Sequence, residues 1–249
     1  MNTVLGLIIL IAQNNLEKGI SYNLANYIID HLDAINEMSM QELSKNCYIS
    51  TSSIIKFCRM LGFSSYNDLK KQLQSTIQTR KLQLDEKQAM LTVDDLIEHM
   101  QHLSPDKILI KDKIDQIVEI IHETKKIYIY GAVFPVMLTQ PFCEDMTIMN
   151  VPVHLEHISY NPLEIEQKDG MVLIISISGR FVETHQNEYH RICKLNSNTV
   201  LISQDINHLD DLKLNIEVPK TISCEYDDLL VLLILDLIKH CYYKKYYQL

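Results

Sequence analysis

Short apolar runs at helical spacing fill the first eighty residues. One of these runs consists of Leu24, Ala25, Ile28, Ile29 and Leu32. Its intervals of three and four residues predict an amphipathic helix with one buried face. We expect Ser21 to cap this helix, and we expect a short apolar helix over residues 3–16 to precede it.

Residues 39–63 predict two short helices joined by a tight turn. Ser39 stands three residues before Glu42, the spacing at which a hydroxyl and a carboxylate cap each other's backbone amides. Ser50 supplies a cap for the second helix, and Gly62 lies where a helix end favours a residue that tolerates positive φ. The apolar stripe of this second helix consists of Ile54, Phe57, Cys58 and Leu61. Such an arrangement is typical of a helix-turn-helix.

Another helix is expected after Gly62, with Ser64 or Ser65 as its cap. The apolar side of this helix consists of Tyr66, Leu69, Leu73 and Ile77. Lys70 and Lys71 should lie near its exposed surface, where lysine side chains are placed to contact a DNA backbone without reading sequence.

Beyond residue 106 the pattern alternates between helix and strand. An amphipathic helix with Ile114, Ile117, Val118 and Ile121 on one face precedes the first strand. The expected strands cover residues 126–131, 151–154, 171–177, 199–203 and 214–218. One helix that ends near Leu195 is expected between the third and fourth strands, and a long final helix starts near Asp227. Strands that alternate with helices indicate a parallel sheet covered on both faces.

Three segments follow from these patterns. Residues 1–80 form a helix-turn-helix domain, residues 81–106 a helical linker, and residues 107–249 an α/β domain. Within the linker, Thr92 should cap a helix that runs through Met100. The predicted fold class is therefore α plus α/β, with an all-helical N-terminal domain followed by a parallel-sheet α/β sandwich.

Charge is unevenly distributed along the chain, whose formal net charge is −9. Residues 39–81 hold seven bases and two acids, whereas residues 91–249 hold 14 bases and 24 acids. A basic module attached to an acidic one is expected when only the first meets phosphates. The alternative interpretation, a DNA-free scaffold with a solvated charged face, is disfavoured by the hydroxyls and bases on the second predicted helix.

The run ELSKNCYISTSSIIKFCRMLGFSSYNDLK resembles the N-terminal domain of RpiR-type transcriptional regulators over roughly residues 20 to 75. Two positions depart from the family pattern. Lys56 replaces an arginine, which keeps the charge but loses bidentate geometry. Tyr48 occupies a turn position where the family favours a small residue, and a positive φ there costs about 1 kcal/mol. The candidate DNA-binding residues are Lys45, Ser50, Thr51, Ser52, Ser53, Lys56, Arg59, Lys70 and Lys71.

The later alternation, with a Gly turn after the first strand and ISISG after another, resembles the sugar-isomerase (SIS) domain of the same regulators. That resemblance implies two strand-end loops that cradle a phosphosugar through glycines and hydroxyls. The candidate ligand-binding residues are Gly131, Ser176, Ser178, Gly179 and Arg180. Three positions depart from the pattern: Val133, Pro135 and Phe181. A phosphosugar, a different ligand, and a domain kept only for dimerisation therefore all stay open.

Cysteines, histidines and acids are the candidates for disulfide, metal and catalytic chemistry. The six cysteines include no CxxC pair, which favours a reducing compartment over disulfides or structural zinc. The pairs His154 with His157 and His185 with His190 lack the zincin spacing, so we expect no metal and no cofactor. A phosphosugar isomerase with Glu183 as base is the enzymatic alternative, but we expect no catalytic residues.

The sequence as a whole predicts a DNA-binding transcriptional regulator of sugar or amino-sugar metabolism genes that responds to a small phosphorylated ligand. Its expected partners are double-stranded DNA, a phosphosugar effector and further copies of itself, as a homodimer or higher homo-oligomer through the sheet and the apolar C-terminal helix. The apolar runs at residues 4–12 and 229–238 are too short to span a bilayer. We therefore expect a cytoplasmic protein without a membrane partner.

Overall fold

The computed structural model describes residues 4–14, 19–90, 92–95, 97–98, 111–132, 136–156, 165–204, 212, 214–218 and 227–248. They pack as two compact units. The first, unit 1, contains residues 1–86 and 143–154, and the second, unit 2, contains residues 87–142 and 155–249. Among the described parts of the chain, no helix is both long enough and apolar enough to cross a membrane.

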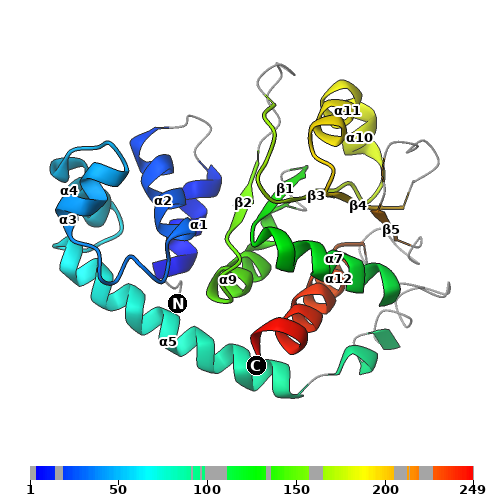
Figure 1. The fold of residues 1–249 in the computed structure, drawn as a ribbon, viewed down its shortest axis with the longest axis horizontal. Helices are drawn as coiled ribbons and strands as arrows, with labels where there is room; N and C mark the ends of the chain where they lie inside the picture. Colours follow the sequence, from blue (N-terminus) through cyan, green and yellow to red (C-terminus); the bar gives the residue numbers. More distant parts are fainter. Residues whose placement is uncertain are drawn as a thin grey trace. The chain divides into compact units, whose positions relative to one another are not determined.

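Five helices begin the chain (Figure 1). They are α1 (Val4–Asn14), α2 (Ile20–Asp30), α3 (Met40–Asn46), α4 (Thr51–Met60) and α5 (Tyr66–Met90). The predicted apolar face of α2 is buried, and α1 packs against this helix. The core of unit 1 is therefore built from the short apolar runs that the sequence places at helical spacing.

The predicted cap of α2 is wrong. The helix begins at Ile20, and its N-cap is Gly19, which makes no side-chain hydrogen bond. The Gly19 carbonyl accepts the amide of Asn23 at 3.0 Å. Because extended backbone at Gly19 starts the helix early, Ser21 lies inside the first turn rather than before it.

Helix α5 is longer than its apolar pattern indicates. The Ser65 hydroxyl accepts the amide of Asp68 at 3.1 Å, so of the two predicted caps Ser65 is confirmed. The helix continues past residue 80 to Met90, so the first residues of the predicted linker lie in the same helix. The predicted cap at Thr92 is also present: its hydroxyl accepts the Asp95 amide at 3.1 Å, and the Thr92 amide donates to the Asp95 carboxylate at 2.8 Å.

A five-stranded sheet carries the second half of the chain, in the order β2-β1-β3-β4-β5. The strands are β1 (Ile127–Gly131), β2 (Val153–Leu155), β3 (Met171–Ile175), β4 (Thr199–Ser203) and β5 (Leu214–Glu217). The pairs β1 with β3, β3 with β4, and β4 with β5 are parallel. Strands β3 and β4 are buried along their whole length, as expected for a sheet covered on both faces.

The helices of unit 2 lie on both sides of this sheet (Figure 1). They include α7 (Lys111–Thr124), α10 (Arg180–Thr184), α11 (Gln186–Leu195) and α12 (Asp227–Tyr242), and α12 continues as a π-helical turn (Tyr243–Tyr247). Figure 1 shows α10 and α11 over one face, and α7 with α12 over the other. A further helix, α9 (Gln140–Ile148), precedes β2. The predicted fold class is confirmed, since a helical region is followed by a covered parallel sheet.

Tyr189 and Ile192 of α11 pack on β1, β3 and β4 through a buried apolar cluster that includes Val172, Ile174 and Leu201. The single helix predicted before residue 195 is in fact two helices. His185 separates α10 from α11 with backbone angles outside the helical region. Its amide still reaches the carbonyls of α10, which tightens the end of that short helix.

Candidate nucleic-acid interface and strand-end loops

The start of α3 carries the predicted capping box. The Ser39 hydroxyl accepts the amide of Glu42 at 3.2 Å, and the Glu42 carboxylate accepts the amide of Ser39 at 2.8 Å. The hydrogen bond from Ser39 lowers the pKa of Glu42 below its ordinary value of 4.5, because it favours the charged carboxylate. The first helix of the pair therefore begins where local sequence predicts it.

Replacing Ser39 with alanine should lower the free energy of unfolding by about 1 kcal/mol, because the Glu42 amide loses its acceptor. Denaturant unfolding, followed by helical circular dichroism, measures this loss, with Ser197→Ala on an exposed turn as control.

The pKa of Glu42 is depressed in the folded chain, so the stabilising effect of its carboxylate is present above pH about 4.5 and is lost as pH falls through the folded pKa. Glu42→Gln should accordingly lose less stability than wild type on acidification, and an equal loss would contradict this role.

Helix α3 ends in a tight turn that contains Tyr48. The amide of Ile49 donates to the Ser44 carbonyl at 3.0 Å, and the amide of Tyr48 donates to the Lys45 carbonyl at 3.3 Å. This pair of bonds is the Schellman arrangement, which places the residue after the C-cap in the left-handed region. Tyr48 has a φ of 54°, so the positive φ considered at this position is present.

Helix α4 has the predicted cap and core. The Ser50 hydroxyl accepts the Ser53 amide at 3.2 Å. Three residues of the predicted apolar stripe are buried, namely Ile54, Phe57 and Cys58. Burial raises the pKa of the Cys58 thiol to about 11, so this thiol stays neutral and behaves as an apolar core group. Gly62 follows the helix with a φ of 88°, as its position predicts.

The outer side of α4 presents hydroxyls and bases to solvent. Ser52, Lys56 and Arg59 are exposed, and their spacing of four and three residues places them on one helical stripe. Thr51 and Ser53 are half-buried. The Ser50 hydroxyl lies 2.7 Å from that of Ser52, so hydroxyls gather where the helix begins and bases lie further along it. This stripe has the donors that contact phosphates and base edges.

The three flanking lysines differ in their availability. Lys45 and Lys71 are exposed. Lys70 is half-buried, and its ammonium donates to the Met38 carbonyl at 3.0 Å and lies 5.2 Å from the centre of the Tyr66 ring. The Lys70 ammonium is therefore bound within its own domain. Its sequence position had predicted a lysine near the exposed surface of the helix.

Gly131 ends β1 where the chain is too crowded for a side chain. A Cβ added there would lie 2.8 Å from the Ile175 carbonyl oxygen and 2.8 Å from the Val136 side chain, so only glycine fits without a shift. Gly131 pairs with Ile175 in the parallel register, which places the two predicted loops at the carboxyl ends of neighbouring strands. The departures predicted at Val133 and Pro135 lie outside the described residues.

The loop after β3 uses one of its predicted hydroxyls internally. Ser176 is buried, and its hydroxyl accepts the amide of Val182 at 3.3 Å. Gly179 has a φ of 78° and donates its amide to the Ser176 carbonyl at 2.9 Å. Ser178 and Arg180 are exposed, and the Arg180 guanidinium donates to the Ser178 hydroxyl at 3.1 Å. The exposed polar groups of this loop are therefore Ser178 and Arg180.

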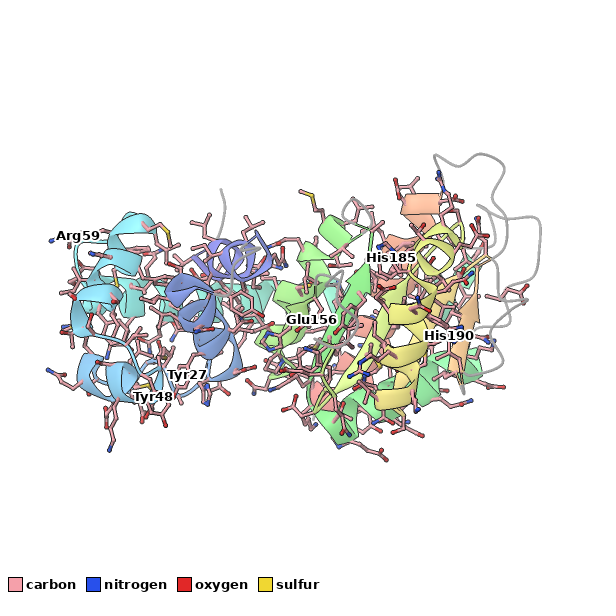
Figure 2. The ribbon with its side chains drawn as sticks, turned by 90° about the horizontal axis from the view of Figure 1, so that it is seen from above. Tyr27, Tyr48, Arg59, Glu156, His185 and His190 are labelled. Carbon is pink, nitrogen blue, oxygen red and sulfur yellow. The ribbon has the colours of Figure 1, made fainter. Side chains whose placement is uncertain are left out.

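Within the described part of the chain, histidine and acid side chains form pairs but do not gather into a metal site. Across the described residues, no group of three or more His, Cys, Asp and Glu side chains is placed to hold a metal. Within unit 1, the ring nitrogens of His154 lie 2.6 Å from the Asn26 amide oxygen and 2.8 Å from the Asp30 carboxylate. His157 lies outside the described residues. Figure 2 shows His185 and His190 at separate places on the surface of unit 2.

Residues 12–80 match the family model described as "Helix-turn-helix domain, rpiR family". These residues form an rpiR-family helix-turn-helix domain. The match contains the whole of α2, α3 and α4 with their turn. The resemblance noted in the N-terminal sequence is thus confirmed, and the exposed stripe on α4 belongs to the second helix of this rpiR-family domain.

Relatives with HTH-type names extend this finding. An uncharacterised HTH-type transcriptional regulator of Caldanaerobacter subterraneus is 38% identical over 61 residues, which cover 24% of this chain and 22% of the relative. The HTH-type transcriptional regulator GlvR of Bacillus subtilis is 25% identical over 170 residues, 65% of this chain and 62% of GlvR. The chain thus spans less than two thirds of the length of these curated relatives.

Two solved structures are similar in backbone course. One is the Vibrio vulnificus NanR protein complexed with ManNAc-6P, with a TM-score of 0.43, 14% identity and coverage of 98% of this chain and 93% of NanR. The other is a Methanococcus jannaschii protein for which a 3-hexulose-6-phosphate isomerase function has been inferred. Its TM-score is 0.47 with 20% identity, over 61% of this chain and 88% of that protein.

Proposed function

We propose that this protein is a sequence-specific DNA-binding transcriptional regulator that inserts α4 into the major groove. The observation that carries the proposal is the stripe of Ser52, Lys56 and Arg59, exposed on the second helix of an rpiR-family domain. In a helix-turn-helix the second helix lies in the groove, and its N-terminal residues meet base edges. Three apolar residues of the same helix are buried in the core of the domain, so the polar side is the one that is free to contact DNA.

Each group on this surface has a chemical role in the proposal. The hydroxyls near the start of α4, including Ser52, donate to and accept from base edges. Lys56 and Arg59 bind bases or phosphates, and Lys45 and Lys71 hold the DNA backbone. Lys70 is the weakest member of this set, because its ammonium already donates to the Met38 carbonyl.

Selection of DNA from a randomised pool by the full-length protein tests this proposal. We expect one enriched sequence, bound more tightly than an unrelated duplex, with an affinity that falls as salt rises. Mapping the protein's bound sites on its own genome then identifies the regulated genes. Retention of no duplex above background at about 50 mM salt would contradict the proposal.

A homodimer is the proposed binding form. A single short recognition helix contacts few base pairs, and two copies related by a two-fold axis read half-sites about one DNA turn apart. The enriched sequence should then be a pseudo-palindrome, and sedimentation of the free protein should give a mass of two or more chains. We also propose a cytoplasmic location for this regulator, because its six cysteines include no CxxC pair, which favours a reducing compartment.

The strand-end loops of unit 2 are proposed to bind a small phosphorylated sugar. Support comes from the glycine requirement at Gly131, the left-handed Gly179 and the exposed pair Ser178 and Arg180. Ligands of open α/β sheets bind beyond the carboxyl ends of the strands. Arg180 supplies the positive charge that a phosphate needs.

A panel of hexose and amino-sugar phosphates at millimolar concentration should include one that raises the midpoint of thermal unfolding of the wild type, because a ligand that binds only the folded state stabilises it. Arg180→Ala should abolish this rise, whereas Lys194→Ala, which removes an exposed charge from α11, should keep it. A panel without any effect would favour a domain that only dimerises.

The proposed regulator binds this sugar without converting it. Glu183 is exposed on the short helix α10 and would be the base of the isomerase alternative. Incubation of the protein with the stabilising sugar phosphate should return it unchanged. Turnover that Glu183→Gln abolishes would instead favour the enzyme.

A further inference from the structure

Three helices in the described chain end in the same hydrogen-bond pattern but with different residues in the left-handed position. Gly62 fills that position after α4, with a φ of 88°, and Asn150 fills it after α9, with a φ of 60°. Both residue types adopt this conformation readily. Tyr48 fills it after α3, with a φ of 54°. A bulky side chain is therefore held in a disfavoured backbone conformation at the turn of the helix-turn-helix.

The fold gains little from the Tyr48 side chain. It is 95% exposed, the highest value among the exposed large apolar residues of the described chain. Its backbone bonds, from the amides of Tyr48 and Ile49, form with any residue that accepts a positive φ. A strained conformation kept without a packing gain is a reason to look for function at that residue.

Tyr48 lies in the turn that precedes α4, the helix that carries the proposed DNA-binding stripe. It lies three residues before Thr51, the first residue of α4, whereas Arg59 lies near the last. Figure 2 shows Tyr48 and Arg59 at two separate places on the surface of unit 1. The helix is about 15 Å long, slightly more than the width of the major groove. When it lies across the groove, each of its ends is therefore close to the phosphates of one of the two DNA strands.

We propose that Tyr48 is a further DNA-contacting residue, whose phenol hydroxyl donates to a backbone phosphate beside the N-terminal end of α4. The proposal rests on the DNA-binding function proposed above. Tyrosine hydroxyls are among the groups that bind DNA phosphates, and the solvated phenol of Tyr48 reaches outward from the turn. The contact is neutral, so it adds affinity without releasing a counterion. This property separates Tyr48 from Lys56 and Arg59.

The test measures binding of the full-length protein by fluorescence anisotropy at several salt concentrations. The probes are a duplex of about 30 base pairs selected by the wild type and an unrelated duplex of equal length. Tyr48→Phe, which keeps the ring and the backbone strain, should weaken binding to both probes by about 3- to 30-fold. The slope of affinity against salt should stay unchanged. Tyr246→Phe, at a half-buried tyrosine of unit 2, is the matched control and should bind as wild type.

Tyr48→Gly separates the contact from folding. It should bind at least as weakly as Tyr48→Phe while its midpoint of thermal unfolding rises, because glycine relieves the positive φ. Binding of Tyr48→Phe at wild-type strength, or loss on the selected duplex alone, would overturn the phosphate contact. A variant with alanine at both Lys56 and Arg59 then separates the two proposals. If this variant binds DNA more weakly than the wild type while Tyr48→Phe does not, the proposed function stands and only this inference fails. If none of these substitutions changes binding, the proposed function fails as well.

Discussion

Replacing both Lys56 and Arg59 with alanine is expected to weaken binding to the selected duplex by at least about 30-fold, a loss of about 2 kcal/mol or more. Both side chains are exposed on one stripe of α4, so their removal takes away charge without opening the core. Each phosphate contact contributes about −0.9 to the slope of log affinity against log salt. Anisotropy titrations over a salt series should therefore show a shallower dependence as well as weaker binding.

The control for this prediction is the pair Lys194→Ala and Lys244→Ala. Both lysines are exposed in unit 2, and their removal lowers the net charge by the same amount. We expect DNA affinity close to wild type for this control, because long-range charge is screened at physiological salt. Equal losses in the two double variants would mean that overall charge, and not the α4 stripe, governs binding.

Phe57→Ala should lower the free energy of unfolding by about 3 to 5 kcal/mol, because it removes a large buried side chain and leaves a cavity. Phe57 is 2% exposed and lies on the inner side of α4 between Ile54 and Cys58, which are also buried. The side that holds α4 in the bundle is thus the one opposite to the proposed DNA-binding stripe. Guanidinium titration followed by circular dichroism measures the loss.

Met60→Ala provides the comparison within the same helix. Met60 is 55% exposed, and substitutions at exposed positions usually change stability by less than about 0.5 kcal/mol. The Phe57 variant should also lose DNA affinity at temperatures where the Met60 variant still binds. Similar stabilities for the two variants would show that α4 is not anchored by its predicted apolar stripe.

Several elements were predictable because their signals are local. The capping box of Ser39 and Glu42 and the cap at Ser50 give the starts of α3 and α4, since both ends of each hydrogen bond lie within three residues. The strand over residues 199–203 was predicted with its observed bounds, because continuous β-branched and apolar residues mark a buried strand.

Other boundaries were wrong or incomplete where local signals compete. Ser21 is a good capping residue, but extended backbone at Gly19 began α2 first. Residues 81–106 were predicted as a helical linker, and α5 continues into this segment as far as Met90, since glutamine, lysine and glutamate are strong helix formers. At His185 the backbone leaves the helical region and divides into α10 and α11 a stretch that was predicted as one helix.

The candidate site residues also include some whose environment was predicted correctly and some whose environment was not. Lys56 and Arg59 are exposed as helical spacing predicts, because the buried stripe of α4 leaves the opposite face to solvent. The hydroxyl of Ser176 was expected to face a ligand, but it accepts the amide of Val182. Whether Arg180 or any other residue of these loops binds a ligand stays a prediction.

Local patterns in the amino-acid order were sufficient for the helix-turn-helix, its caps and the inner and outer faces of α4, because hydrogen bonds and side-chain periodicity there act over a few residues. Contacts between distant residues required the folded chain. The Lys70 ammonium donates to Met38, 32 residues away, and His154 lies against Asp30, 124 residues away. No short-range pattern encodes such pairs, since they depend on how whole elements pack. Tyr48 depends on both local and distant interactions. The position of its left-handed backbone follows from the end of α3, whereas the near-complete exposure of its side chain follows from the packing of the bundle.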